Sequence, residues 1–299
     1  MALADTEIAP EIDPVTLLGA IGHRDARDIV RIKGGWDTLI WRFQDNCGEL
    51  RSMRVYWLPD REESSRKEIA ALRHCEAAGF PAPRVESVCH ITDMPVAVLS
   101  WVPGRPVLTD VERRPWNLGR LSHLMGATQA RLHSLNPPEE FRHGAPESWT
   151  GLVQPGYVRL AEELGVFGLS TSAFIHMDFH PLNILAENGR LTGVVDWAGA
   201  AAGDPRADLA RTDVTVETAP IPPGPMRPVL TVLRRLMLRG WREGYRSVAG
   251  SIPDYRPFRR WAAASLLREV SRVVGRPDVW AEPEYLGRLH SIAGSDGPA

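Results

Sequence analysis

Apolar and polar positions in residues 26–33 and 50–58 alternate with the two-residue period of β-strands. In residues 50–58, for example, Met53 and Val55 share one face while Ser52 and Arg54 share the other. Residues 61–79 break this period with apolar side chains at helical spacing and a terminal glycine. The pattern predicts five strands, over residues 26–33, 38–43, 50–58, 84–90 and 95–101. We therefore expect a five-stranded antiparallel sheet with one long helix after its third strand.

The rest of the chain is dominated by helical periods. A short helix is also predicted near the start, over residues 13–22, with Asp13 as its N-cap and Pro14 at its first position. Prolines predict irregular connections over residues 136–155 and 219–228. The later predicted helices cover residues 116–134, 157–164, 206–214, 229–248, 257–274 and 282–292. The fold class is thus α+β, with a small sheet lobe over residues 1–102 and a larger, mostly helical lobe over residues 103–299.

One stretch, residues 174–197, departs from both periods because it concentrates polar side chains between short apolar runs. The runs 184–186 and 191–195 are separated by four polar residues that include Asn188 and Gly189, and Asn-Gly between apolar runs predicts a β-hairpin. Asp178 and Asn183 precede this hairpin and Asp196 ends it. We expect the hairpin to fold Asp196 back beside Asn183.

Composition narrows the classes of protein. The 299 residues, 43% of them hydrophobic, suffice for two lobes with buried cores. The net charge of −2 and the lack of a basic run disfavour nucleic-acid binding. No apolar run approaches the roughly 18 residues that span a membrane, and residues 1–14 lack the apolar core of a signal peptide. The three cysteines form no disulfide framework and suit a reducing cytoplasm. Nothing decides between a monomer and a dimer.

The polar residues of the central stretch predict phosphoryl transfer. Asp178 is a candidate general base, while Asn183 and Asp196 supply the hard oxygen ligands that Mg²⁺ takes together with waters and phosphate oxygens. A loop aspartate, a loop asparagine and a later aspartate are the parts that kinase-type transfer uses. A plain turn, in which Asp and Asn cap backbone groups, is the alternative for each residue alone. The ordered set on a predicted loop and hairpin favours the chemistry.

The motif His176-Met-Asp178-Phe-His180-Pro-Leu-Asn183-Ile-Leu, followed by Val-Val-Asp196-Trp, resembles that of the aminoglycoside phosphotransferase and choline kinase family. That family has a protein-kinase-like fold, and its pattern runs His-Gly-Asp-x-His-x-x-Asn-Ile-Leu. Met177 stands where glycine is usual, which places a bulkier side chain beside the base. The segment 203–210 resembles the family's Gly-Asp-Pro-x-x-Asp-Leu-Ala. By the resemblance, its Asp204 and Asp208 brace the loop.

The resemblance also implies a nucleotide-binding role for residues 1–102. Gly34 and Gly35 stand where the family places its phosphate-covering turn, although an ordinary turn has the same sequence. Arg54 occupies the strand position at which this fold normally carries a phosphate-gripping lysine. Its partner would be Glu68 of the following helix, with Glu62 and Glu63, one turn or more earlier, as weaker candidates. The alternative for Arg54 is a solvated edge residue. The backbone of Ser100 to Val102 would form the hinge that meets the purine base, which leaves ATP and GTP both possible.

The histidines and aromatic residues receive supporting roles. His176 is predicted to brace the loop, and His133 to pack at a helix end. His180 lies two residues after Asp178, so it is a candidate to reach the transferring phosphate and is counted with the catalytic residues. The helices near the C-terminus usually wall the acceptor site in the family, and here they carry Trp261, Trp280 and Tyr285.

Other classes fit less well. A metal hydrolase built on the His-x-Asp-x-His of 176–180 would need further His or Cys ligands, a serine hydrolase lacks its Gly-x-Ser-x-Gly, and a protein kinase lacks Asp-Phe-Gly. The predicted function is transfer of the γ-phosphate of ATP or GTP, with Mg²⁺, to a hydroxyl of a small molecule, with an aminoglycoside-like antibiotic as the favoured acceptor. An amino alcohol, a sugar, a macrolide or a nucleoside antibiotic stays open as acceptor, and so does a non-catalytic nucleotide-binding module.

Overall fold

The computed structural model describes residues 11–32, 38–153, 155–271 and 283–294. The chain forms two compact units. The first comprises Met1–Pro103 together with the short segment Gly193–Ala198, and the second comprises Gly104–Thr192 and Gly199–Ala299. The lobe boundary expected after residue 102 therefore needs one addition, because the segment at the end of the hairpin packs with the first unit.

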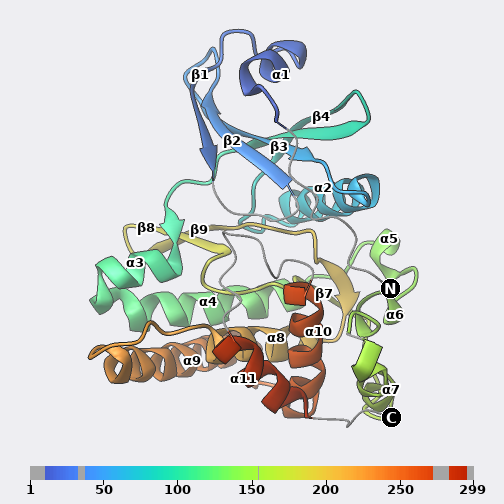
Figure 1. The fold of residues 1–299 in the computed structure, drawn as a ribbon, viewed down its shortest axis with the longest axis vertical. Coiled ribbons are helices and arrows are strands. Elements are labelled where there is room, and N and C mark those ends of the chain that lie inside the picture. Colours follow the sequence, from blue (N-terminus) through green and yellow to red (C-terminus); the bar gives the residue numbers. More distant parts are fainter. Residues whose placement is uncertain (1–10, 33–37, 154, 272–282, 295–299) are drawn as a thin grey trace. The chain divides into compact units, whose positions relative to one another are not determined.

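The first unit is built on a five-stranded antiparallel sheet in the order β1-β2-β3-β5-β4 (Figure 1). The predicted sheet, with its long helix after the third strand, is confirmed. The elements of this unit are α1 (Pro14–Ala20), β1 (Arg27–Ile32), β2 (Thr38–Gln44), β3 (Leu50–Tyr56), α2 (Arg61–Ala77), β4 (Val85–Ile91) and β5 (Met94–Ser100).

Strand alternation separates the core of the sheet from its functional face. One face buries a cluster of apolar side chains from α1, β2, β3 and β5, including Trp41, Phe43, Met53 and Val55. Arg54 lies between Met53 and Val55 in β3, so its side chain leaves from the opposite face, which α2 covers. Helix α1 begins as predicted, because the Asp13 carboxylate accepts hydrogen bonds from the backbone N–H groups of the first turn.

The second unit is mostly helical, as predicted. Its helices are α3 (Val107–Arg113), α4 (Leu118–His133), α5 (Glu139–Arg142), α6 (Glu147–Thr150), α7 (Val158–Gly165), α8 (Pro205–Thr218), α9 (Arg227–Ala249), α10 (Arg259–Ser271) and α11 (Pro283–Ala293). Its short strands are β6 (Arg105–Pro106), β7 (Ala173–Ile175), β8 (Ile184–Glu187), β9 (Arg190–Val194, which runs into the first unit) and β10 (Ala201–Gly203).

Helices α4 and α9 lie side by side in this unit (Figure 1). Glycines permit their close approach. A Cβ atom on Gly126 would lie 1.9 Å from the carbonyl oxygen of Trp241, and one on Gly244 would lie 1.9 Å from that of His123. The two backbones are therefore in contact, and any side chain at these positions would force the helices apart.

Several short elements were not predicted. The connection 136–155, expected to be irregular, contains α5 and α6, and the strands β6, β7 and β10 were missed. Strands β7 and β10 pair antiparallel, with Ala201 opposite Ile175 and Gly203 opposite Ala173. The helix predicted over 206–214 extends to Thr218. The helix predicted over 257–274 is described as far as Ser271, with a 3₁₀ turn at its start.

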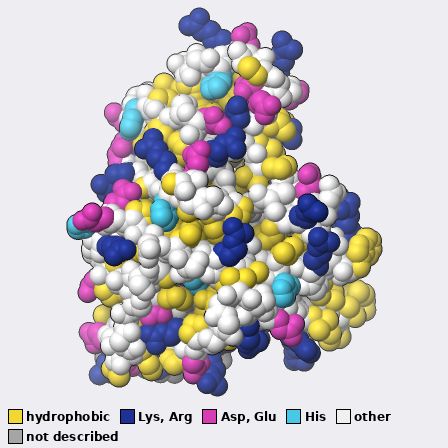
Figure 2. All heavy atoms as spheres, turned by 180° about the vertical axis from the view of Figure 1, so that it is seen from behind, with side chains coloured by type: hydrophobic (Ala, Val, Ile, Leu, Met, Phe, Trp, Pro, Cys, Tyr) yellow, Lys and Arg dark blue, Asp and Glu magenta, His cyan; other side chains and the backbone are white. Residues whose placement is uncertain are grey.

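The surface carries charges of both signs. Figure 2 shows Lys and Arg side chains interspersed with Asp and Glu on the face that it presents, in keeping with a net charge of −2. Among the described helices, every one is too short or too polar to cross a bilayer.

Candidate active site

The hairpin of the central stretch is present as predicted. Strands β8 and β9 are joined by Asn188 and Gly189, whose φ angles of 51° and 72° are those of a two-residue type I′ turn. Strand β6 pairs with β8 on the other side. The hairpin confirms the local architecture, and it carries the chain from Asn183 in the second unit to Asp196 in the first.

Three predicted site residues meet in the loop before the hairpin. The side-chain amide of Asn183 donates to the Asp178 carboxylate at 2.6 Å and to the Asp178 carbonyl at 3.0 Å. His180 Nε2 lies 3.3 Å from the same carboxylate and 3.3 Å from the Asn183 amide nitrogen. The Asp178 side chain is 33% exposed. The loop thus presents a carboxylate that is held by its neighbours yet open to an incoming molecule.

Helix α8 binds this loop through three of its side chains. The Asp208 carboxylate accepts from the Met177 backbone N–H at 2.6 Å, and Arg211 Nε donates to the Met177 carbonyl. The Thr212 hydroxyl donates to the Phe179 carbonyl at 2.8 Å. Residues three and four apart share one helix face, so one face of α8 binds the backbone on both sides of Asp178.

Met177 adopts a left-handed backbone conformation, with φ 69°. This conformation costs a residue with a Cβ about 1–2 kcal/mol, whereas glycine adopts it freely. This explains why the family motif has glycine at the position of Met177. Here the hydrogen bonds from Asp208 and Arg211 of α8 hold the Met177 peptide in this conformation. Met177 is itself buried, at 4% exposure, so it fills space beneath the loop.

His176 supports the loop and His133 packs at the end of α4, in line with their predicted roles. His176 is fully buried, and its Nδ1 accepts from the Asp178 backbone N–H at 3.2 Å. His133, at the end of α4, contacts Asp208 and Tyr245, each at 2.9 Å. Asp204 caps α8 by accepting from the Arg206 backbone N–H at 2.9 Å. Asp204 and Asp208 therefore have structural roles.

Electrostatics keep Asp178 ionised. Its burial alone would raise the pKa of the carboxyl, but the neighbouring His180 imidazole and the Arg211 guanidinium hold that pKa well below its usual range. Arg211 Nη2 lies 4.0 Å from the carboxylate. Sequence reasoning missed Arg211, because its contact with the loop depends on how α8 packs and leaves no local signal.

The first unit brings together another part of the predicted set. Arg54 forms an ion pair with Glu68, whose second oxygen accepts from the Tyr56 hydroxyl at 2.8 Å. The Trp197 backbone N–H lies 3.4 Å from Glu68 Oε1, which ties the residue after Asp196 to the same carboxylate. The suggestion that Arg54 is a solvated edge residue is wrong, because β3 is an interior strand and Arg54 is 8% exposed.

Neighbouring carboxylates keep the Arg54 guanidinium protonated, as neighbouring cations keep Asp178 ionised. Burial alone would lower the pKa of the Arg54 guanidinium, but Glu68, and more weakly Asp196, raise it. Asp196 is half-buried and has φ 66°, the second left-handed residue of the motif. A buried cation beside a partly exposed carboxylate suits a site that receives a phosphate and its metal ion.

The side chains of two predicted hinge residues, Ser100 and Val102, contact other parts of the first unit. The Ser100 hydroxyl accepts from the Arg84 backbone N–H at 2.8 Å, and Val102 packs closely against Gly193. Gly34 and Gly35 lie outside the described residues.

The predicted base and metal ligands are divided between the two units. Asp178 and Asn183 belong to one unit and Asp196 to the other, so their convergence stays a prediction. Within the described ranges, no three His, Cys, Asp or Glu side chains form a metal cluster.

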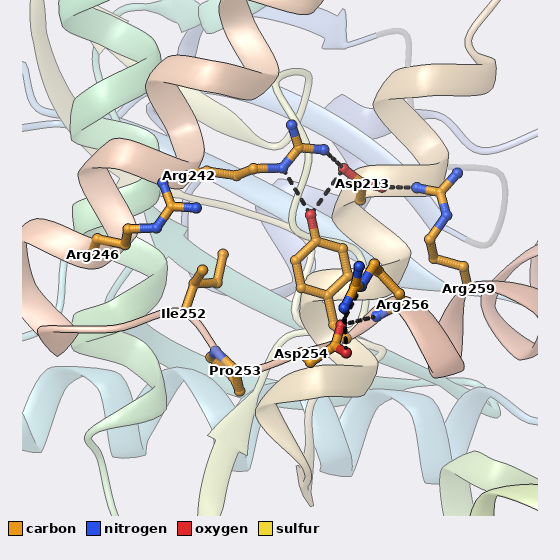
Figure 3. Close-up of a pocket in the computed structure, with 9 residues that line it drawn as sticks. Asp213, Arg242, Arg246, Ile252, Pro253, Asp254, Arg256 and Arg259 are labelled. Atoms are coloured by element: carbon orange, nitrogen blue, oxygen red, sulfur yellow. Dashed lines mark hydrogen bonds and ion pairs between the residues drawn. The ribbon is translucent and has the colours of Figure 1, made fainter.

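A pocket of about 520 Å³ lies elsewhere in the second unit (Figure 3). The buried Asp213 accepts from Arg242 and Arg259, and Arg256 pairs with both oxygens of Asp254 at 2.7 and 2.8 Å. The lining carries more guanidinium groups than carboxylates, so it has an excess of positive charge. The lining residues are Asp213, Arg242, Arg246, Ile252, Pro253, Asp254, Tyr255, Arg256 and Arg259. None of them was predicted as a site residue.

Comparisons with known proteins identify the family and the fold. Residues 28–250 match the model of the phosphotransferase enzyme family. A stretch of 154 residues is 30% identical to viomycin phosphotransferase of Streptomyces vinaceus, covering 44% of this chain and 54% of that protein. The chain thus matches about half the length of this relative.

Solved structures share the fold. Amicoumacin kinase hAmiN, in complex with AMP-PNP, Ca²⁺ and Ami, aligns with a TM-score of 0.65 at 14% identity, covering 94% of this chain and 92% of that one. A thermostable mutant (D198A) of aminoglycoside phosphotransferase APH(4)-Ia, in ternary complex with ADP and hygromycin B, aligns with a TM-score of 0.59 at 18% identity, covering 94% and 98%. The predicted α+β fold, kinase-like with a small sheet lobe and a larger helical lobe, is confirmed.

Proposed function

Because the chain belongs to the phosphotransferase enzyme family, we propose that it transfers the γ-phosphate of ATP or GTP to a hydroxyl group of a small molecule. The observation that carries this proposal is the loop in which Asp178, His180 and Asn183 contact one another while the Asp178 carboxylate stays partly exposed. An ionised carboxylate in this position can accept a hydrogen bond from an acceptor hydroxyl.

Asp178 is the proposed general base. It orients the acceptor hydroxyl and takes its proton while the hydroxyl oxygen bonds to the γ-phosphorus. The bond between that phosphorus and the bridging oxygen breaks, and the nucleoside diphosphate leaves. His180, beside Asp178, is proposed to donate a hydrogen bond to the transferring phosphate. In such transfers, catalysis comes mainly from positioning and from stabilisation of charge.

The nucleotide is assigned to residues of the first unit. Arg54, paired with Glu68, is proposed to grip the phosphates, since a guanidinium can bind two phosphate oxygens at once. Gly34 and Gly35 are proposed to cover the phosphates, and the backbone from Ser100 to Val102 to meet the purine. AMP-PNP and ADP occur in the two structurally similar proteins, which favours ATP and leaves GTP open.

Asn183 and Asp196 are the proposed ligands of a Mg²⁺ ion. The donor set fits, because the amide nitrogen of Asn183 is directed at Asp178 and its amide oxygen is the atom suited to a cation. When bound, such an ion neutralises charge on the nucleotide phosphates. Few protein ligands suffice, since Mg²⁺ keeps waters and takes phosphate oxygens.

An antibiotic is the favoured acceptor, because similar proteins are named viomycin phosphotransferase, amicoumacin kinase and aminoglycoside phosphotransferase, the last in complex with hygromycin B. An amino alcohol or a sugar is the second candidate. A monomer or dimer in the cytoplasm is proposed for the protein itself, and the three free cysteines suit that reducing compartment.

The test is an ADP- and GDP-release screen over antibiotics, amino alcohols and sugars, with product mass as the second readout. Asp178→Ala should lower kcat at least about 10²-fold, as the loss of a general base does. The matched control is Asp254→Ala, which removes another arginine-paired aspartate outside the loop. Near-normal turnover of a folded Asp178→Ala variant would refute the assignment. Nucleotide binding without transfer to any acceptor would favour the non-catalytic module.

A further inference from the structure

We propose that Arg211 is a positioning residue for Asp178, acting through the Met177 peptide; this rests on the proposed role of Asp178 as base. Arg211 lies in the middle of α8 and is 3% exposed. Its Nε donates to the Met177 carbonyl, which immediately precedes Asp178. The same guanidinium stands 4.0 Å from the Asp178 carboxylate. One side chain therefore holds the backbone of the base and faces its charge.

The guanidinium is itself anchored from a third element. Its Nη1 donates to the Ser265 hydroxyl and its Nη2 to Glu269 at 2.9 Å, both from α10. The catalytic loop, α8 and α10 are thus joined through three different nitrogens of one side chain. Only arginine offers donors in such a fixed planar fork. A lysine could keep the charge but could not hold these three partners in one plane.

The distances around Arg211 fit a residue that positions Asp178 and does not react itself. Arg211 Nη2 is hydrogen-bonded to Glu269 and too far from Asp178 for a hydrogen bond. The carboxylate consequently remains open to a hydroxyl, while Asn183 holds one of its oxygens at 2.6 Å. The left-handed Met177 peptide, with φ 69°, needs support on both sides. Asp208 supports its N–H and Arg211 its carbonyl.

The test compares Arg211→Met, Arg211→Lys and the control Arg242→Met. Arg242 is an arginine of α9 that pairs with buried Asp213 but makes no contact with the loop in the described structure. A small displacement of a catalytic group costs about 10²-fold, so Arg211→Met should lower kcat by about that factor. The KM for nucleotide and its Kd by calorimetry should change by less than about threefold. Arg211→Lys should lose less, and Arg242→Met should keep kcat within about threefold.

A double-variant cycle tests the route through the Met177 peptide. Glycine adopts φ 69° without strain, so a loop with Met177→Gly should depend less on its support. The kcat loss caused by Arg211→Met should shrink at least about fivefold in the Met177→Gly background. If Arg211→Met does not fold, Ser265→Ala and Glu269→Gln loosen the same guanidinium and should each lower kcat by about three- to tenfold.

Three results would overturn the inference. The first is a folded Arg211→Met variant with kcat within about threefold of the parent. The second, where that variant does not fold, is normal kcat in both anchor variants, Ser265→Ala and Glu269→Gln. The third is a parallel loss of nucleotide affinity and kcat, which would indicate general damage. Failure of the proposed function is distinguishable, since it would show as missing phosphoryl transfer in the parent protein or as normal turnover of Asp178→Ala.

Discussion

Replacing Glu68 by glutamine should destabilise the first unit strongly, although the change removes only a charge. The side chains of Arg54 and Glu68 are 10% and 2% exposed, so water cannot replace the lost partner. Breaking a buried ion pair by removing one member typically costs about 3–5 kcal/mol, because the other charge is left uncompensated. The amide introduced by Glu68→Gln still offers an oxygen that can accept from Tyr56 and Arg54. We therefore expect a loss at the lower end of that range, about 3 kcal/mol.

Urea denaturation of the variant and the parent measures this loss. The double substitution Arg54→Met with Glu68→Leu should recover most of the stability, since apolar replacements of a buried pair are often neutral or stabilising. The same double variant should lose its affinity for MgATP if Arg54 grips the phosphates. A loss below about 1 kcal/mol in Glu68→Gln would refute the view that Arg54 depends on this pairing. Unchanged MgATP affinity in the double variant would refute its nucleotide role.

Three further predictions address other parts of the molecule. Asp196→Ala should abolish the Mg²⁺-dependent part of nucleotide binding, as calorimetry with and without the metal would measure, and equal affinities in parent and variant would exclude this ligand. Gly126→Ala should cost about 2–3 kcal/mol in urea denaturation because its Cβ would collide with the α9 backbone, whereas Gly119→Ala on α4, with no atom within 4 Å, should gain about 0.5–1 kcal/mol; a neutral Gly126→Ala would contradict the close packing. Burial, followed by the charge of Glu269, raises the pKa of Tyr285 to about 12, so its contribution to stability is complete below about pH 10 and is lost as the pH rises towards 12. Between about pH 9 and 11 the free energy of unfolding of the parent should fall by about 1.4 kcal/mol more than that of Tyr285→Phe, and equal losses would contradict the raised pKa.

The sheet and the long helices could be predicted because their signals are local. Apolar and polar positions alternate along β2 and β3, β5 is a short apolar run, and the helical period repeats over longer segments. The hairpin was predictable because Asn188 and Gly189 both take positive φ. Strands β7 and β10, of three residues each, are too short to show a period, so only their pairing defines them.

In the candidate site, too, some residues could be predicted from the sequence and others could not. The placement of Arg54 opposite Glu68 could be predicted from the family resemblance, and the structure pairs the two side chains between β3 and α2. Arg211 was not predictable, because it reaches the loop and α10 across 34 and 54 residues of sequence. The burial of its guanidinium depends on the packing of α8 against α10, and no nearby residue of the sequence reports that packing.

The binding of the loop to one face of α8 has a consequence for how the site loses its order. Residues 176–180 have no regular secondary structure, yet the Met177 amide is bonded to a buried side chain of the helix. Amide hydrogens of this kind exchange with solvent only when their partner element opens. We therefore expect the loop to open together with α8. On heating, we expect the geometry around Asp178 to persist until that helix itself unfolds, so the proposed activity should have the thermal limit of the core of the second unit.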